Sequence, residues 1–422
     1  MPARGLSTVD AQTYWMSAKI PNDQFLLYGF AGVPSELDRA LEEIRERALG
    51  CPELRLRVRD RRFLTYPTWV TCDVGVDQFV VHDLADRTWT GCLAAVAGLS
   101  AHQLDAHTMS WRLYVFTPVE GGPCAGVGTV AVLQATHAFG DGIRSSALAA
   151  LLFGRRGPVP AVKAPAPFRG AALPWRMLRA ARTHRHLVRD TEAGLVPAQA
   201  ESRPALHSNN RPAGTRSVRT VVLRRDQLSG PTVTVGVLAA VSAALSDHLR
   251  EFGDDTANLG AEVPMAKSGV RHAHNHFGNV GIGLYPELEF GERTDRIAGD
   301  LAQRRRRAAH PAMSAASRAS AAVPAPLLRW GVAQFDPDVR SPTVTGNTVV
   351  SSVNRGAADL RFGAAPVVLT AGYPGLSPMM GLTHGVHGIG DTIAVSVHAA
   401  ESAIGDVDAY VERLAAALMD HR

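Results

Sequence analysis

One histidine lies in a pattern that could carry acid–base chemistry. His137 follows the apolar run of residues 127–134, and Asp141 and Gly142 come four and five residues after it. Imidazole has an unperturbed pKa of roughly 6.5, so it can accept a proton near neutral pH. A carboxylate at this spacing can hold the turn through an arginine or backbone amides, and a glycine permits backbone geometry that a Cβ would block. A single histidine in a tight turn is most often structural, but the complete pattern favours a general base.

The elements around this pattern place His137 at the end of a strand. Residues 127–134 are apolar enough for a central strand, and a mostly apolar segment of helical character follows Gly142 and runs to residue 152. Side chains at the ends of strands, where loops begin, often line binding clefts. We therefore expect His137 to lie in a cleft at the edge of a lobe.

Strands and helices alternate in both halves of the chain. Alternating or continuous apolar residues predict strands at 54–58, 111–116, 218–223, 279–284, 348–353 and 392–398. Helical spacing predicts helices at 37–48, where Ser35 and Asp38 form a capping box, and at 234–249 and 406–418. The pattern predicts a two-lobed α/β (α+β) protein in which each lobe is a mixed sheet with flanking helices.

Positive charge is concentrated between the two halves. Residues 155–225 contain 15 Lys and Arg but only 3 Asp and Glu, whereas the net charge of the whole chain is +5. Prolines within 157–168 and 201–214 exclude central strands and helix interiors there. We therefore divide the chain into an N-terminal lobe of residues 1–154, a basic crossover linker of residues 155–215 and a C-terminal lobe of residues 216–422.

Arginines interleave with apolar residues in the middle of this crossover. Trp175, Met177, Leu178 and Leu187 share residues 175–189 with five arginines. A basic amphipathic helix of this kind can lie on an anionic membrane or a lipid droplet. A solvated linker helix is the alternative.

Composition excludes several classes of protein. With 46% hydrophobic and 20% charged residues, the chain is typical of folded globular proteins. The four cysteines form no CxxC pair and the first ten residues hold no apolar segment, so we expect a cytoplasmic protein without a secretory signal. The most apolar run, residues 233–245, is shorter than the about 18 residues that a membrane span needs. Since no nucleic-acid-binding module is recognisable, we expect no nucleic-acid partner.

Two further clusters have a plain structural interpretation. His272, His274 and His276 alternate along one segment, but no carboxylate or cysteine follows closely, so we expect no metal site. The four arginines of residues 304–307 are expected on the solvated face of a helix, with contacts to anionic lipid or phosphate as the alternative.

His137, Asp141 and Gly142 form the pattern HxxxDG, which resembles the active-site motif of the CoA-dependent acyltransferase superfamily. The surroundings resemble one branch of it, the bacterial wax ester synthase/diacylglycerol acyltransferase family. Short segments similar to that family's motifs occur in order along nearly the whole chain: Leu6-Ser7 with Asp10, Pro52 with Leu54-Arg55, Leu104-Asp105 with Trp111, Val263-Pro264, Gly278-Asn279, Val349 to Val353 with Gly356, and Ala371-Gly372.

The resemblance implies a chloramphenicol-acetyltransferase-like fold and a reaction. The reaction is the transfer of a fatty acyl group from acyl-CoA, a co-substrate, to a diacylglycerol or a long-chain alcohol, with no permanently bound cofactor. His137 would be the general base and Asp141 would hold its loop. Asn279 and Ser351 are candidates for the substrate or oxyanion side. A cytoplasmic enzyme associated peripherally with a lipid surface would fit this chemistry.

The chain departs from the family's pattern at four places. Thr136 replaces the first of two consecutive histidines, Thr234-Val235 replaces an Asn-Asp pair, Ser352 replaces an Asn, and Met109-Ser110 replaces the Pro-Leu before Trp111. These departures leave three functions open: an O-acyltransferase of triacylglycerol or wax ester synthesis, a catalytically degenerate lipid-binding homologue, and an acyltransferase of secondary metabolism. The intact HxxxDG motif favours the two enzymes.

Overall fold

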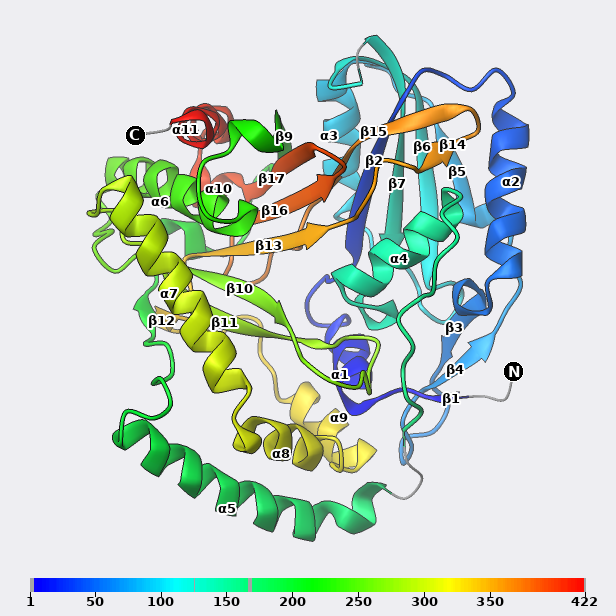
Figure 1. Ribbon diagram of the computed structural model, residues 1–422. Helices are drawn as coiled ribbons and strands as arrows, with labels where there is room; N and C mark the ends of the chain where they lie inside the picture. The colour runs from blue at the N-terminus through cyan, green and yellow to red at the C-terminus, as the bar shows by residue number, and fades with distance from the viewer. Residues whose placement is uncertain (1–3, 125, 166–168, 421–422) are drawn as a thin grey trace.

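Two six-stranded sheets form the framework of the protein (Figure 1). The computed structural model describes residues 4–124, 126–165 and 169–420. The strand order is β14-β15-β2-β7-β6-β5 in the first sheet and β11-β10-β13-β16-β17-β9 in the second. Both sheets are mixed and helices flank them, so the predicted fold class is confirmed.

The first sheet is built around β7 (Gly126–Ala135). Its antiparallel neighbours are β6 (Trp111–Gly122) and β2 (Gln24–Ala31), and β5 (Phe79–His82) runs parallel to β6. Val130 and Val132 are fully buried, as are the residues between and beside them, which confirms that the apolar run is a central strand. The helices of this lobe are α2 (Leu37–Gly50), α3 (Trp89–Leu99) and α4 (Gly142–Leu152).

Two strands of the first sheet come from the C-terminal half of the chain. β14 (Arg361–Phe362) pairs with β15 (Ala365–Gly372), and β15 runs antiparallel to β2, with Thr370 opposite Tyr28. Both appear in orange beside the blue and cyan strands of Figure 1. The division of the chain at residues 154 and 215 remains a prediction, but the first sheet takes strands from both sides of it.

The second sheet consists of residues from the C-terminal half. Its strands are β9 (Arg216–Arg224), β10 (Gly260–Ala266), β11 (Phe277–Gly283), β13 (Thr348–Asn354), β16 (Leu382–Ile389) and β17 (Thr392–Ala400). Four of them, β9, β11, β13 and β17, lie where the apolar pattern predicts strands. The long helices α6 (Val233–Glu251), α7 (Phe290–Ala308) and α11 (Val407–Met419) pack against this sheet, and the first and last confirm predicted helices.

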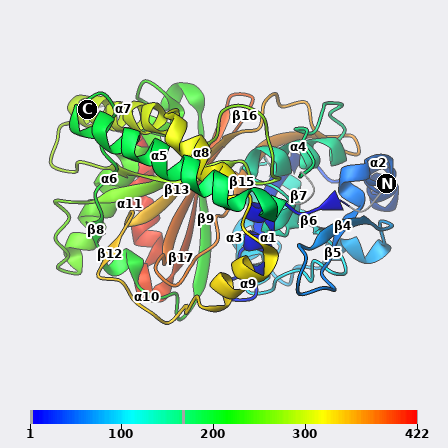
Figure 2. The same ribbon diagram turned by 90° about the horizontal axis from the view of Figure 1, so that it is seen from below.

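The crossover folds back onto the body of the protein. Its helix α5 (Leu173–Glu192) lies along α8 (Pro311–Ser320), as Figure 2 shows from below. β8 (Arg203–Pro204) then pairs with β12 (Thr343–Val344). No helix among the described residues is long and apolar enough to span a membrane.

The arginines at the end of α7 contact this crossover: Arg305 and Arg306 are exposed as predicted, while Arg304 and Arg307 are only partly exposed. Arg304, Arg306 and Arg307 donate to the backbone carbonyls of three crossover residues, at 2.5, 2.7 and 2.9 Å. The carbonyls belong to Ala198, Leu195 and Pro197. The charged face of α7 is partly covered because a chain segment more than a hundred residues away returns to it.

Two local predictions also need correction. The capping box is wrong, because α2 begins at Leu37 and its N-cap is Glu36, which makes no side-chain capping hydrogen bond. Leu54 lies in a short 3-10 turn that Pro52 begins, so strand β3 starts only at Leu56. The strand ends at Arg59 and belongs to a small sheet with β4 (Thr68–Thr71) and β1 (Arg4–Gly5). The remaining helices are α1 (Thr8–Met16), α9 (Ala325–Ala333) and α10 (Glu401–Ile404).

Candidate active site

His137 lies in the turn between β7 and α4. β7 ends at Ala135, residues His137–Phe139 form one 3-10 turn, and α4 begins at Gly142. Asp141 is the N-cap of α4, because its Oδ1 accepts the backbone N–H of Arg144 at 3.0 Å. The strand, turn and helix that the sequence pattern predicts are all present.

Asp141 also ties this turn to a segment from the C-terminal half. Its Oδ2 accepts Nη1 of Arg271 at 2.6 Å and the backbone N–H of His276 at 2.8 Å. The side chains of Asp141 and Arg271 are 7% and 10% exposed, so the ion pair is largely shielded from water. Arg271 donates further to the carbonyl of His274 at 2.8 Å. These contacts make Asp141 a structural carboxylate that holds the turn.

Asp10 in the first turn of α1 makes a second link between the two halves. Its Oδ1 accepts the backbone N–H and the Nδ2 of Asn275 at 2.9 and 3.1 Å, and its Oδ2 accepts the backbone N–H of His274 at 2.9 Å. Asn275 Nδ2 also donates to the carbonyl of His137 at 2.8 Å. Burial raises the pKa of Asp10, although these hydrogen bonds act in the opposite direction. The chain of contacts from Asp10 through Asn275 fixes the backbone at His137.

His274 supports the same turn from within the core. Its ring stacks on Trp69, with centroids 5.1 Å apart and planes 10° apart, and its Nδ1 lies 3.1 Å from the carbonyl oxygen of Phe139. Burial, assisted by the charge of Arg144, lowers the pKa of His274 well below its ordinary value, so the ring is neutral. Nδ1 therefore carries the proton and donates to Phe139. The described residues contain no group of three or more potential metal ligands placed to hold an ion.

The imidazole of His137 is held in place but remains accessible. Gln24 Nε2 lies 3.2 Å from its Nδ1 and donates to the carbonyl of Gly140 at 2.6 Å. The ring of Phe277 lies nearly parallel to it, at a centroid distance of 6.0 Å. Burial lowers the pKa of His137, and nearby carboxylates oppose this effect only in part. The ring is therefore neutral at pH 7 and can accept a proton.

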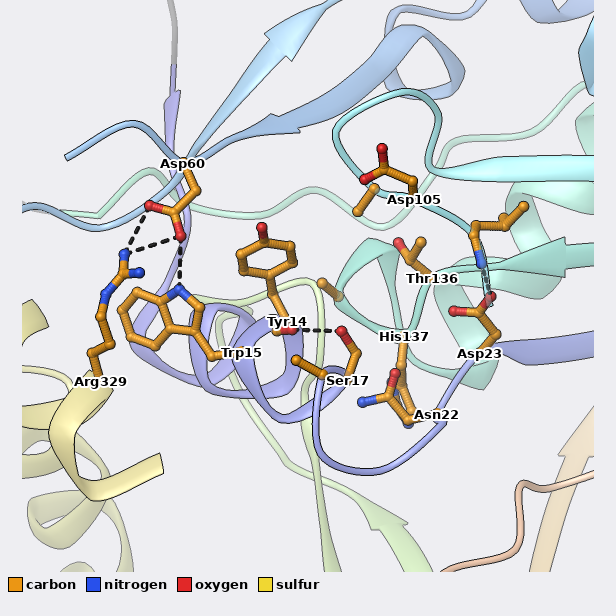
Figure 3. Close-up of a pocket in the computed structure, with 14 residues that line it drawn as sticks. Tyr14, Trp15, Ser17, Asn22, Asp23, Asp60, Asp105, Thr136, His137 and Arg329 are labelled. Atoms are coloured by element: carbon orange, nitrogen blue, oxygen red, sulfur yellow. Dashed lines mark hydrogen bonds and ion pairs between the residues drawn. The ribbon is translucent and has the colours of Figure 1, made fainter. Parts of the chain in front are cut away.

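His137 lines a cavity of about 310 Å³ beside α1 (Figure 3). Residues of α1, the loop before β2, the segment around Asp105, the turn before α4 and helix α9 surround it. The lining residues are Tyr14, Trp15, Ser17, Ala18, Asn22, Asp23, Asp60, Leu104, Asp105, Ala106, Thr136, His137, Ala138 and Arg329. Because α9 belongs to the C-terminal half, the cavity lies where the two halves of the chain meet.

Gly142 is favoured by close packing and not by the predicted backbone geometry. It is the first residue of α4 and has no positive φ. A Cβ on it would lie 3.0 Å from Cγ2 of Val353, a contact tighter than side chains ordinarily make. Val353 belongs to β13, so the glycine lets the second sheet approach the turn closely.

The structure does not bring Asn279 and Ser351 to this cavity. Asn279 in β11 donates to Oε1 of Glu262 at 2.5 Å, and Ser351 in β13 pairs with Gly385. Neither residue is part of the cavity lining. Their roles on the substrate or oxyanion side stay predictions.

The four departures from the family pattern fall into two places. Thr234 at the start of α6 donates its hydroxyl to Oγ of Ser352 at 2.9 Å, so two of them contact each other. Thr136 lies in the cavity wall next to His137, and its backbone N–H donates to the carbonyl of Ser110 at 3.0 Å, which places the departure at Met109-Ser110 beside it. Change in the sequence is thus localised at one helix terminus and at the candidate site itself.

Sequence reasoning missed three residues that organise the site: Gln24, Arg271 and Asn275. The last two belong to the polar run of residues 271–276, which drew attention only through its histidines. This run connects the antiparallel strands β10 and β11, and all six of its residues are polar or small. A connection so rich in polar groups could have indicated a segment that forms hydrogen bonds with other loops. Nothing in the local sequence marks Gln24.

No family model matches the chain, and no curated protein matches it. Solved structures match it over nearly its whole length. A wax ester synthase/diacylglycerol acyltransferase from Marinobacter aquaeolei VT8 is 16% identical, with a TM-score of 0.63 and 98% of each chain covered. The chain has the two-lobed condensation and acyltransferase fold.

Condensation domains show the same likeness. The starter condensation domain of rhizomide synthetase RzmA, solved as a mutant in complex with C8-CoA and Leu-SNAC, is 13% identical with a TM-score of 0.58. The comparison covers 98% of this chain and 93% of that one. The first condensation domain of the CDA synthetase is 15% identical with a TM-score of 0.57, over 99% and 96% of the two chains.

Proposed function

We propose that this protein is an acyltransferase that moves an acyl group from acyl-CoA to a hydroxyl acceptor, with His137 as the general base. The observation that carries the proposal is a neutral imidazole in the wall of a cavity, in a turn that buried hydrogen bonds from both halves of the chain hold rigidly. The fold supports it, since one protein of this fold is a wax ester synthase/diacylglycerol acyltransferase and another was solved with C8-CoA.

The proposed reaction needs no nucleophile from the protein. The acceptor hydroxyl gives its proton to His137 while its oxygen attacks the carbonyl carbon of the thioester. A C–O bond forms and a tetrahedral oxyanion results. Its collapse breaks the C–S bond, and the coenzyme A sulfur takes the proton from the imidazolium as it leaves. General base catalysis of this kind contributes about 10²–10⁴-fold to the rate.

Cations near the turn suit the phosphates of coenzyme A. Arg271 and Lys267 act together on His276, whose pKa is lowered first by burial and then by these charges. The backbone N–H of Lys163 donates to the carbonyl of Arg271 at 2.9 Å, which brings a third cationic residue to the same segment. None of the three lines the cavity. Arg271 is already paired with Asp141, so we assign the anionic donor to the side of this segment that carries Lys267 and Lys163, and the acceptor to the cavity.

The resemblance predicts a diacylglycerol or a long-chain alcohol as acceptor, and α5 supports work at a lipid surface. Trp175, Met177 and Leu178 are 66%, 54% and 44% exposed, with exposed arginines beside them. A helix of this kind docks on anionic membranes. Sedimentation with anionic vesicles should therefore carry the protein down, and Trp175→Ser should weaken the effect. A solvated linker helix would bind neither anionic nor zwitterionic vesicles.

The reaction is tested by thiol release from a panel of acyl-CoAs, each with and without alcohol acceptors. Wild type should release thiol with at least one donor and acceptor pair, and His137→Ala should be slower by about 10²–10⁴-fold. His184→Ala, on the exposed face of α5, is the matched control and should retain full activity. Full activity in His137→Ala would contradict the role of the base. No release with any pair would favour the catalytically degenerate, lipid-binding alternative.

A further inference from the structure

The wall of the cavity beside His137 carries more negative than positive charge. Three carboxylates and one guanidinium line it (Figure 3). Asp60 accepts Nη2 of Arg329 at 2.8 Å and Nε1 of Trp15 at 2.9 Å, so these two charges neutralise each other. Asp23 and Asp105 form no ion pair within the described part of the chain. The lining therefore holds two uncompensated negative charges.

Asp23 is buried without a charged partner. The residue is 6% exposed. Its Oδ2 accepts hydrogen bonds from the backbone N–H of Leu104 at 2.7 Å and from Nε2 of Gln134 at 2.8 Å. Both donors are neutral, and in the described ranges no donor reaches Oδ1. Burial raises the pKa of Asp23 to about 6, against the effect of these hydrogen bonds. A buried carboxylate costs free energy unless a cation or further donors compensate it.

Thr136 borders the same cavity and lies directly before His137 in the chain. The residue is 6% exposed, and its hydroxyl has no hydrogen-bond partner among the residues that the structure describes. Buried hydroxyls in native proteins nearly always have a partner. This oxygen is itself covered by protein atoms, so the recognition of a ligand rests on the carboxylates of the wall.

Asp105 extends the negative field across the cavity to Tyr14. Burial raises the pKa of the Tyr14 hydroxyl to about 12, and the charges of Asp60 and Asp105 act in the same direction. The hydroxyl lies 2.8 Å from Nε2 of His107. Asp105 therefore acts on the cavity side of Tyr14, and it is exposed to solvent, whereas Asp23 lies deep in the wall.

We infer that the acceptor carries a cationic nitrogen, which Asp23 and Asp105 bind while a hydroxyl or a second, uncharged amine of the same molecule lies against His137. The inference rests on the acyl transfer proposed above and extends its acceptor group from a hydroxyl to an uncharged amine, which would give up its proton to His137 in the same way. The phosphates of coenzyme A would be repelled by this wall, so the cavity suits the acceptor. A diacylglycerol has no charge to pair with these carboxylates. The volume of about 310 Å³ is near the lower end of the about 300–1,000 Å³ found for small-molecule sites, which fits an amino alcohol or a diamine.

Matched acceptors test this inference. Choline, an amino alcohol and a diamine are each compared with an uncharged isostere, such as the dimethylbutanol in which carbon replaces the nitrogen of choline. The readouts are thiol release and equilibrium binding of the same probes by calorimetry. We expect at least one cationic probe to exceed its isostere at least tenfold in kcat/KM and in affinity. Asp23→Asn and Asp105→Asn should each reduce this ratio several-fold, while Asp83→Asn, with a side chain 96% exposed, should leave it unchanged.

The outcomes separate the inference from the proposed function. Thiol release that is as fast with the isosteres as with the cations, or fastest with long-chain alcohols, would overturn the inference and leave acyl transfer intact. A preference for cations that neither Asp23→Asn nor Asp105→Asn alters would overturn it as well. Absence of thiol release, together with tight binding of a cation that Asp23→Asn weakens, would overturn the reaction but support the recognition. Absence of both would overturn the two together.

Discussion

Three buried aspartates lie around His137, and they are used in two different ways. Asp10 and Asp141 are 1% and 5% exposed, and both oxygens of each accept hydrogen bonds from the other half of the chain or from a helix start. Asp23 is 6% exposed, but only one of its oxygens accepts hydrogen bonds from residues that the structure describes. Similar burial thus accompanies opposite degrees of compensation.

The difference indicates which carboxylates serve the fold and which serve a ligand. Asp10 and Asp141 join the turn of His137 to residues 271–276, so their oxygens already accept hydrogen bonds from the protein. Asp23 borders the cavity with one oxygen free of protein donors in the described part of the chain. Substitutions at the first two should disturb folding, whereas substitution at the third should disturb recognition and relieve a folding cost.

The largest effect is expected from breaking the ion pair of Asp141 with Arg271. Asp141→Asn leaves the guanidinium of Arg271 in a site where it is 10% exposed. Removing one partner of a buried pair costs about 3–5 kcal/mol, so urea unfolding should show a loss of that size, together with loss of acyl transfer. The double variant Asp141→Asn/Arg271→Met removes the unpaired charge and should recover part of the lost free energy of unfolding. A loss within the about 0.5 kcal/mol typical of surface substitutions would contradict the structural role.

Asp23→Asn should instead stabilise the protein, and the gain should depend on pH. Burial raises the pKa of Asp23 from 3.8 to about 6, so the ionised form is disfavoured in the folded state. This penalty is fully present above about pH 6 and disappears as the pH falls toward 3.8, because the folded state then holds the proton. The variant should gain at most about 3 kcal/mol near pH 8 and little near pH 4.

Urea unfolding of wild type, Asp23→Asn and the control Asp83→Asn across this pH range measures the gain. The asparagine can still accept both hydrogen bonds through its Oδ1, so the comparison isolates the charge. A destabilised Asp23→Asn protein at neutral pH would place Asp23 with Asp10 and Asp141 and remove the contrast among the three.

Asn275→Ala should have an intermediate effect. The side chain links Oδ1 of Asp10 to the carbonyl of His137, and both acceptors are buried or nearly so. Leaving such groups unsatisfied costs about 1–3 kcal/mol. We expect a loss of this size in unfolding, with a fall in kcat larger than any change in KM because the base is displaced. Asn279→Ala is the matched control, since Asn279 is exposed and lies outside the cavity lining. An equal loss of activity in both variants would support the predicted substrate-side role of Asn279 and contradict a specific role of Asn275.

Much of the framework could be predicted from the sequence, because its signals are local. The apolar run before His137 predicts a central strand, and alternation or helical spacing predicts most of the other strands and helices. The pattern HxxxDG marks the turn, the histidine proposed as its base and its structural carboxylate. Each of these signals spans fewer than about 20 residues, the range over which periodicity carries information.

The rest could not be predicted, because it depends on contacts between distant segments. Asp10 reaches Asn275, and Asp141 reaches Arg271, across 265 and 130 positions of the chain. Strand β15 crosses into the first sheet for the same reason, and no local pattern states which sheet a strand will join. Even Gly142 is explained by Val353 rather than by its own turn.

The smallest effect is expected at Arg329, and it would extend the contrast to Asp60. Arg329 contacts both oxygens of Asp60 at 2.8 and 3.0 Å, and its guanidinium lies 4.5 Å from the ring centroid of Trp15. Arg329→Met removes this cation while Trp15 still donates to Asp60, so the cavity gains one uncompensated negative charge. Two unit charges about 4 Å apart in water interact with about 1 kcal/mol, so the added negative charge should change the affinity for a cationic acceptor several-fold.

The preference for cationic over uncharged acceptors should therefore rise several-fold in Arg329→Met and stay at the wild-type value in Arg329→Lys, which keeps the charge. The measurement is the ratio of kcat/KM values for choline and its dimethylbutanol isostere. An unchanged ratio in Arg329→Met would mean that recognition is confined to direct contacts with Asp23 and Asp105. A rise of the predicted size would mean that the summed charge of the wall selects the acceptor, and that Arg329 limits the preference for cationic acceptors.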